Sequence, residues 1–169
     1  MSLLYRLSPN RIIIAAALFL VATANLTFFR AVLALYPLAD NFGFVASLAI
    51  LLAACLTLLM SVFSLALPWR WTVSLFLMTA AASSYFSDQF GTVIDLDMIR
   101  NVYETDAAES LDLFSSDLIF RVFFLGIVPV ALLWWLPTPV TGFVRQKAFH
   151  ALTGLLAVGI MAICVAGFS

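Results

Sequence analysis

The residues of this sequence that are best suited to binding chemistry lie in one polar passage, DMIRNVYETDAAES, between Asp97 and Ser110. If the passage is helical, successive residues rotate by about 100°, and one face within an arc of about 80° carries four polar side chains. These are Asn101, Thr105, Glu109 and Asp112. A carboxylate in such a row can accept hydrogen bonds from an ammonium group, while the amide and the hydroxyl can donate to phosphate oxygens. Each charge-assisted hydrogen bond of this kind contributes about 1.5 to 3 kcal/mol. The spacing is therefore compatible with a binding site for a zwitterionic group with a phosphate and an amine.

A second interpretation of the same passage is purely structural. Asp97 is a suitable N-cap for a helix, and Asp106 followed three residues later by Glu109 resembles a capping box that starts another short helix. Asn101 and Thr105 are then solvated surface residues. The spacing alone leaves both interpretations open.

The elements that must position this passage are membrane-spanning helices. Apolar residues make up 64% of the 169 positions and charged residues 10%, with a mean hydropathy of +1.13. A soluble domain has about 25% charged residues. In lipid, backbone polar groups must pair within the chain, and long apolar runs without alternation favour helices over a barrel. We therefore predict an all-α fold, a polytopic membrane helix bundle in which residues 1–169 form one transmembrane domain.

Five apolar runs approach or reach the roughly 17 to 25 residues that a transmembrane helix needs. The predicted spans cover residues 12–32, 44–67, 71–86, 118–135 and 149–168. Residues 87–116 join the third and fourth spans as a predicted amphipathic helical segment on the outer side of the membrane. Because a hairpin between neighbouring helices needs only about two to eight residues, this segment has a purpose beyond connection.

The distribution of charge predicts the orientation of the chain. With the N-terminus in the cytoplasm, the cytoplasmic side holds five basic residues: Arg6, Arg11, Arg70, Arg145 and Lys147. The outer side holds the other three basic residues, Arg30, Arg100 and Arg121, and all nine acidic residues. This asymmetry follows the positive-inside rule. Five spans then bring the C-terminus to the outer side, and we expect the sequence to be the membrane domain of a longer protein.

Residues that could carry catalysis or bind a metal are scarce. Cys55 and Cys164 lie in different apolar runs and are expected to be small packing residues, while His150 stands alone among basic residues. The sequence has no phosphate-binding glycine loop and no nucleophile elbow. We predict no catalytic residue and no metal ligand in this chain, which by itself is expected to be inactive.

One run of the sequence resembles a known family. YFSDQFGTVIDLDMIRNVYETDAAES, Tyr85 to Ser110, resembles the periplasmic segment of the lipid A phosphoethanolamine transferases, which include the mobile colistin resistance enzymes. The D-x-D-M-I-x-N core and the E-T-D-x-A-E ending carry the resemblance, together with the stretch from Asn25 to Phe29. With the five predicted spans, the resemblance extends over essentially the whole chain.

The resemblance implies a multi-pass enzyme of the bacterial inner membrane with a cytoplasmic N-terminus and a periplasmic C-terminus. Such an enzyme takes phosphoethanolamine from phosphatidylethanolamine, holds it on a threonine and delivers it to lipid A, which confers polymyxin and colistin resistance. In that family the threonine and the zinc ligands lie in a periplasmic domain after the fifth span, and that domain is absent from this sequence. The family's headgroup contacts correspond here to Asn101, Thr105 and Glu109. The implied partners are the donor lipid, lipid A and the membrane, without nucleic acid.

Other functions remain compatible with the sequence. A phosphoethanolamine transferase that modifies core sugars or glucans would have a similar membrane domain. A phosphoglycerol transferase has a similar architecture, although the acidic outer face argues against an anionic donor. A non-enzymatic membrane protein, such as a transporter subunit, would carry ionisable residues within its spans. Here, Arg30 and Arg121 come close to that description, and both can extend to the interface.

Overall fold

The computed structural model describes residues 8–90, 115–138 and 142–167, and this part of the chain is entirely helical. The helices are α1 (Pro9–Ala24), α2 (Leu26–Leu35), α3 (Leu38–Ala66), α4 (Trp69–Phe90), α7 (Ser116–Arg121), the π-helix η2 (Val122–Ile127), α8 (Val128–Trp135) and α9 (Phe143–Ala166). The predicted all-α class is therefore confirmed for the described residues. The predicted segment 87–116 lies largely outside them.

Three of the five predicted spans coincide with helices that are long and apolar enough to cross a membrane. These helices are Leu38–Ala66, Ser116–Trp135 and Phe143–Ala166. The first predicted span, 12–32, corresponds to the bent pair of α1 and α2, which satisfies the same criteria if it is counted as one span. The third, 71–86, lies within α4, which does not satisfy them and contains several serines and threonines as well as Arg70 and Asp88. By length and composition the described residues thus hold three candidate spans, or four with the bent pair.

The first predicted span is bent because of Asn25. This residue has φ −119° and ψ 25°, outside the helical range, and its side-chain Nδ2 donates to the carbonyl oxygen of Leu20 at 2.9 Å. The amide thus pairs with a carbonyl at the end of α1, where the main chain leaves the helix. As a result, α2 leaves α1 at an angle of 63°.

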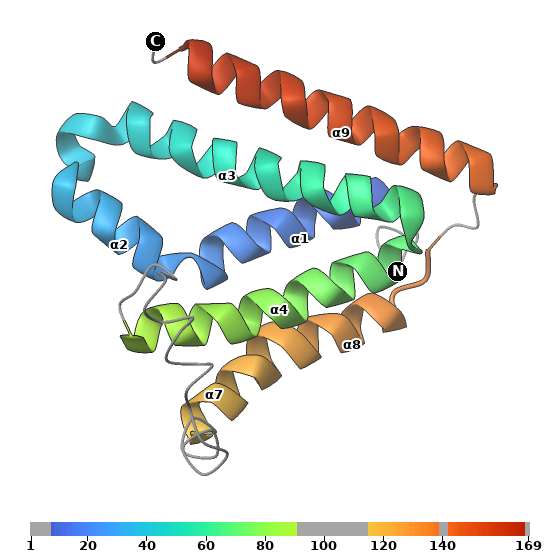
Figure 1. Cartoon of the computed structure of the whole chain (residues 1–169), viewed down its shortest axis with the longest axis horizontal. Helices are drawn as coiled ribbons and strands as arrows, with labels where there is room; N and C mark the ends of the chain where they lie inside the picture. Colours follow the sequence, from blue (N-terminus) through green and yellow to red (C-terminus); the bar gives the residue numbers. More distant parts are fainter. Residues whose placement is uncertain (1–7, 91–114, 139–141, 168–169) are drawn as a thin grey trace, which may run out of the picture.

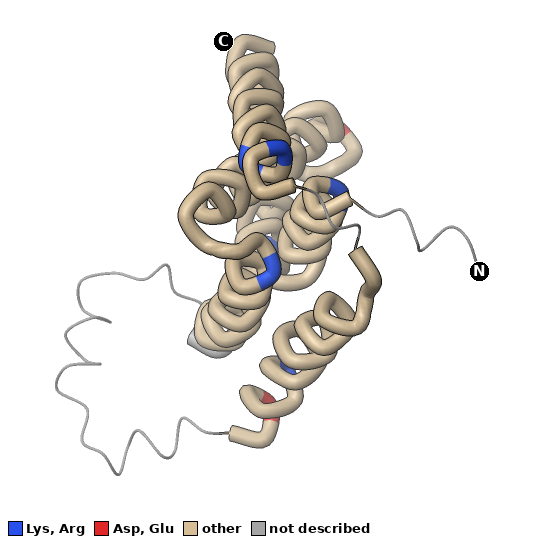
Figure 2. Tube along the Cα trace, turned by 90° about the vertical axis from the view of Figure 1, so that its right-hand side faces the viewer, with Lys and Arg blue, Asp and Glu red and all other residues tan. Residues whose placement is uncertain are grey.

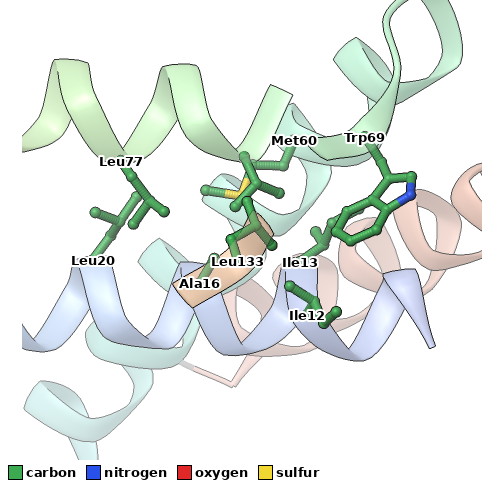
Figure 3. Close-up of a cluster of buried hydrophobic side chains, with 9 residues drawn as sticks. Ile12, Ile13, Ala16, Leu20, Met60, Trp69, Leu77 and Leu133 are labelled. Atoms are coloured by element: carbon green, nitrogen blue, oxygen red, sulfur yellow. The ribbon is translucent and has the colours of Figure 1, made fainter. Parts of the chain in front are cut away.

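Helix α4 has neighbours on opposite sides. Figure 1 shows α1 and α3 on one side of α4, α7 and α8 on the other, and α9 against α3. Nine buried side chains from α1, α3, α4 and α8 form one apolar cluster (Figure 3). The cluster consists of Ile12, Ile13, Ala16, Leu20, Met60, Trp69, Val73, Leu77 and Leu133. In lipid such a cluster stabilises the bundle through close packing rather than exclusion of water.

The helix from Ser116 to Trp135 changes its winding where it meets α4. Pro129 lacks a backbone N–H, so the carbonyl of Leu125 loses its helical partner, and the Val128 N–H bonds instead to the carbonyl of Phe123 in a wider turn. Gly126 lies in this turn and is buried against α4. A Cβ atom at Gly126 would lie 2.9 Å from Met78 Sδ. Glycine therefore allows the close approach of η2 to α4.

Charged residues are distributed unevenly between the two ends of the bundle: the acids gather at one end, where Arg121 pairs with Asp88, and the other basic residues named below lie at the opposite end. Figure 2 shows Lys and Arg at the end where α1, α4 and α9 begin. At this end Arg70 Nη2 donates to the carbonyl of Leu136 at 2.8 Å, and Lys147 Nζ donates to the carbonyl of Ser64 at 2.7 Å. The described acids, Asp40, Asp88 and Asp117, lie at the start of α3, the end of α4 and the start of α7. Because α3 and α7 begin at the end where α1 and α4 finish, the acids gather at the opposite end.

Candidate functional site

The three predicted headgroup contacts lie outside the described residues. Asn101, Thr105 and Glu109 belong to the part of the chain between residues 91 and 114, so their prediction stays a prediction. The structure does describe both flanks of this part: the last turns of α4 and the start of α7. The candidate site is therefore built from these flanks.

A hydrogen bond joins the two flanks. The hydroxyl of Tyr85 and the Oγ atom of Ser115 are 2.5 Å apart, although 30 positions separate the residues in sequence. Ser115 is also the N-cap of α7, where its Oγ accepts from the backbone N–H of Leu118 at 3.2 Å. Tyr85 is buried, so its hydroxyl needs this partner. One serine thus starts α7 and holds it against α4.

The carboxylate of Asp88 connects three helices. Its Oδ1 accepts a hydrogen bond from Thr27 on α2, and its Oδ2 forms an ion pair with Nη1 of Arg121 on α7. The same Nη1 donates to the backbone carbonyl of Ser84 at 3.0 Å. Both carboxylate oxygens therefore have donors, and the end of α4 is linked to α2 and α7.

These contacts determine the ionisation of Asp88, which lies just beyond the predicted third span. Burial raises the pKa of the carboxyl, because it removes water from the charged form. The hydrogen bonds from Thr27 and Arg121, and the positive charges of Arg121 and Arg30, lower it by more. The pKa of Asp88 therefore lies below its ordinary value of 3.8, and the group is a carboxylate at neutral pH.

The flanks also line an open pocket of about 430 Å³, called here the α4–α7 pocket. Its lining consists of Tyr85, Asp88, Asp117, Phe120, Arg121, Phe124 and Leu125. Asp117 is exposed and lies four residues before Arg121, a spacing at which an acid and a base on one helix can pair. Arg121 instead pairs with Asp88, so Asp117 has no ion-pair partner among the described residues. The pocket thus combines a paired guanidinium, an unpaired carboxylate and aromatic rings.

From the sequence, Arg121 is expected to extend to the interface, and Asp88 is one of nine acids expected on the outer side. The positions of the two residues relative to the predicted spans are a signal for their pairing. Asp88 lies two residues after the third predicted span and Arg121 lies three residues inside the fourth, so both are expected at similar depth with opposite charge. Because the rotation of each helix was not known, the pair could not be inferred from depth alone.

Metal-binding residues do not converge in the described part of the chain. No three His, Cys, Asp or Glu side chains lie close enough together there to hold an ion. Cys55 and Cys164 are both free thiols. His150 on α9 is 1% exposed, and its ring nitrogens have no hydrogen-bond partner among the described residues. These residues do not fit a zinc site.

Comparisons with known proteins identify relatives of this chain. The family model described as phosphoethanolamine transferase EptA/EptB matches residues 52–169. Phosphatidylethanolamine transferase Mcr-2 of Escherichia coli is 39% identical over 128 residues, covering 76% of this chain and 24% of the relative. Phosphatidylethanolamine transferase Mcr-1 of Escherichia coli is 40% identical over 126 residues, covering 72% of this chain and 23% of the relative. Phosphoethanolamine transferase EptA of Escherichia coli strain K12 is 28% identical over 159 residues, covering 92% of this chain and 29% of the relative.

The chain spans about a quarter of the length of the curated relatives that it matches. No solved structure matches it significantly. The family match covers most of the chain and extends to its last residue, so it includes both flanks of the candidate site. The chain therefore belongs to the phosphoethanolamine transferase EptA/EptB family, of which it represents the N-terminal domain.

Proposed function

We propose that this chain is the membrane domain of a phosphoethanolamine transferase, which anchors the enzyme and binds the donor lipid phosphatidylethanolamine for transfer to lipid A. The observation that carries the proposal is the family match over residues 52–169. Mcr-1 and Mcr-2, two relatives of this chain, are named as phosphatidylethanolamine transferases. Modification of lipid A would confer resistance to polymyxin and colistin on the bacterium.

The proposed arrangement in the inner membrane has five spans, with the N-terminus in the cytoplasm and the C-terminus in the periplasm. Helix α4 supplies the span that hydropathy alone does not support. Its 22 residues extend about 33 Å, slightly more than a hydrocarbon core of about 30 Å, so its last residues, including Asp88, lie at the outer boundary of the span. Thr72, Ser74 and Ser84 on α4 are buried against neighbouring helices, which removes their hydroxyls from the lipid. The basic end of the bundle would lie in the cytoplasm.

Within this proposal, Asn101, Thr105 and Glu109 contact the donor headgroup. Glu109 accepts hydrogen bonds from the ethanolamine ammonium, and Asn101 and Thr105 donate to phosphate oxygens. The contacts at Tyr85–Ser115 and Asp88–Arg121 support this assignment, because they hold the two flanks of the segment together at the acidic end of the bundle.

The domain contributes position rather than bond-breaking chemistry. A lipid held at a fixed height meets a nucleophile tethered to the same protein as an effectively intramolecular partner, which lowers the entropic part of the barrier. The nucleophile and zinc are assigned to the catalytic domain of the full-length enzyme. In the described part of this chain no three His, Cys, Asp or Glu side chains converge to hold a metal ion.

The proposal is tested with Glu109→Gln in the full-length enzyme that carries this domain. We expect strongly reduced modification of lipid A, measured by mass spectrometry of extracted lipid A, and unchanged amounts of enzyme in the membrane. Glu104→Gln is the matched control, because in a helix position 104 is rotated by about 140° from position 109. Full modification by Glu109→Gln, or an equal loss in both variants, would contradict the assignment.

A further inference from the structure

The α4–α7 pocket presents opposite charges from one short helix. Asp117 and Arg121 both line it and lie one turn apart on α7. Asp88 pairs with Arg121, whereas Asp117 has no ion-pair partner among the described residues. A ligand that is only anionic would therefore meet a repelling carboxylate. A ligand with an anionic group and a cationic group can place the first near Arg121 and the second near Asp117.

Arg121 is held in a fixed position and still has donors to offer. Its Nη1 donates to Asp88 Oδ2 and to the Ser84 carbonyl, which anchors the guanidinium to α4. The guanidinium has five N–H donors in one plane. Within the described residues, its contacts use Nη1 alone, so Nε and Nη2 remain for a ligand in the pocket. Planar pairs of donors suit the oxygens of a phosphodiester.

The wall of the pocket is apolar and accessible. Phe120 and Phe124 stack with ring centroids 6.4 Å apart and an interplanar angle of 10°, and their exposed fractions are 63% and 58%. These rings continue from the pocket lining onto the outer surface of α7 and η2. Hydrocarbon chains next to the pocket would cover this surface.

We propose that the α4–α7 pocket is a phospholipid subsite in which Arg121 binds the phosphodiester, Asp117 binds the headgroup amine and the stacked phenylalanines contact the acyl chains. The inference rests on the proposed function, since it adds described residues to the contacts of the donor lipid. Asp88 also lines the pocket, and its ion pair with Arg121 positions the guanidinium for the lipid. Tyr85 and Ser115 hold the two walls of the pocket together.

The test is native mass spectrometry of the 169-residue chain with phosphatidylethanolamine and phosphatidylglycerol in competition. The two lipids share the phosphodiester, but phosphatidylglycerol lacks the amine. We expect Asp117→Asn to reduce the preference for phosphatidylethanolamine about tenfold while total lipid retention persists. Asp40→Asn is the matched control, because Asp40 is also an exposed acid in the first turn of a helix but lies outside the pocket. An unchanged preference in Asp117→Asn would overturn the role of this residue.

Arg121→Gln is expected to weaken retention of both lipids by a similar factor, because both lose the contact to the phosphodiester. Arg121→Lys keeps the charge, and the double variant Asp88→Asn/Arg121→Gln removes both members of the ion pair, so a folding defect can be separated from lost binding. Arg145→Gln, at the other end of the bundle, is the control. Wild-type retention in Arg121→Gln, or an equal loss in Arg145→Gln, would overturn the phosphodiester contact.

A soluble competitor separates a lipid site from a site for free headgroup. Glycerophosphoethanolamine has the phosphodiester and the amine but no acyl chains, and it is expected to displace the lipid only at far higher concentration. Equal displacement at equal concentration would overturn the role of Phe120 and Phe124. If Asn101→Ala/Thr105→Ala/Glu109→Ala loses the preference and Asp117→Asn keeps it, the proposed function stands and this inference fails. Equal retention of both lipids by the wild-type chain contradicts both.

Discussion

Asp88 near the end of α4 and Arg121 at the end of α7 form an ion pair across 33 positions of the sequence. The pair is about three-quarters buried, and Thr27 on α2 occupies the other carboxylate oxygen. One charged contact therefore joins the three helices around the candidate site. Removing this contact should therefore lower the free energy of unfolding of the bundle.

The stability supplied by Asp88 should depend on pH. Because its pKa is lower in the folded protein than the ordinary 3.8, the unfolded chain binds the proton first as the pH falls. We expect Asp88→Asn to cost about 1 to 3 kcal/mol at pH 7. This difference is present above pH 3.8 and disappears as the pH falls through the lowered folded-state value. Thermal unfolding of both proteins in detergent, followed by circular dichroism from pH 7 to pH 2.5, measures it.

Asp40→Asn is the control for this titration. Asp40 is exposed and has no ion pair among the described residues, so its substitution should leave the unfolding temperature nearly unchanged throughout the pH range. A difference between wild type and Asp88→Asn that is equally large at pH 7 and at pH 2.5 would show that the carboxylate charge is not the cause.

The close contact between η2 and α4 predicts opposite effects at two helical glycines. At Gly126 a Cβ atom would approach Met78 Sδ to 2.9 Å and Ala81 Cβ to 3.4 Å, so the Met78 side chain must move and Gly126→Ala should cost up to about 1 kcal/mol. At Gly159 on α9 nothing lies within 4 Å, so Gly159→Ala should stabilise by up to about 1 kcal/mol through helix propensity. Thermal unfolding in detergent distinguishes the two, and a stabilising Gly126→Ala would contradict this packing.

The hydrogen bond between Tyr85 and Ser115 predicts non-additive substitutions. Tyr85→Phe removes one hydroxyl and should cost about 0.5 to 1.5 kcal/mol. Ser115→Ala also removes the N-cap of α7, which adds about 1 kcal/mol. Because both variants lose the same hydrogen bond, the double variant should be more stable than the sum of the single effects implies. Fully additive unfolding free energies would mean that the two hydroxyls do not interact.

The sequence alone was sufficient for the helical class and for the long apolar spans. The predicted spans 44–67, 118–135 and 149–168 coincide with helices that meet the length and hydropathy criteria. This succeeds because a backbone in lipid must satisfy its own hydrogen bonds, so a run of apolar residues has few other structures available. The resemblance at Tyr85–Ser110 also indicated the family that the comparisons show. The headgroup contacts Asn101, Thr105 and Glu109 stay predictions.

The tertiary structure decided how these helices meet. The bend at Asn25 and the packing of α4 between its neighbours were not visible in hydropathy, which averages over all faces of a helix. Arg121 pairs with Asp88 although Asp117 is nearer in the sequence. This pairing, like the pocket beside it, depends on the rotation of α4 relative to α7. That rotation follows from contacts such as Gly126 against Met78, which form between residues far apart in the chain. The hydropathy of each helix taken separately does not predict such contacts between helices.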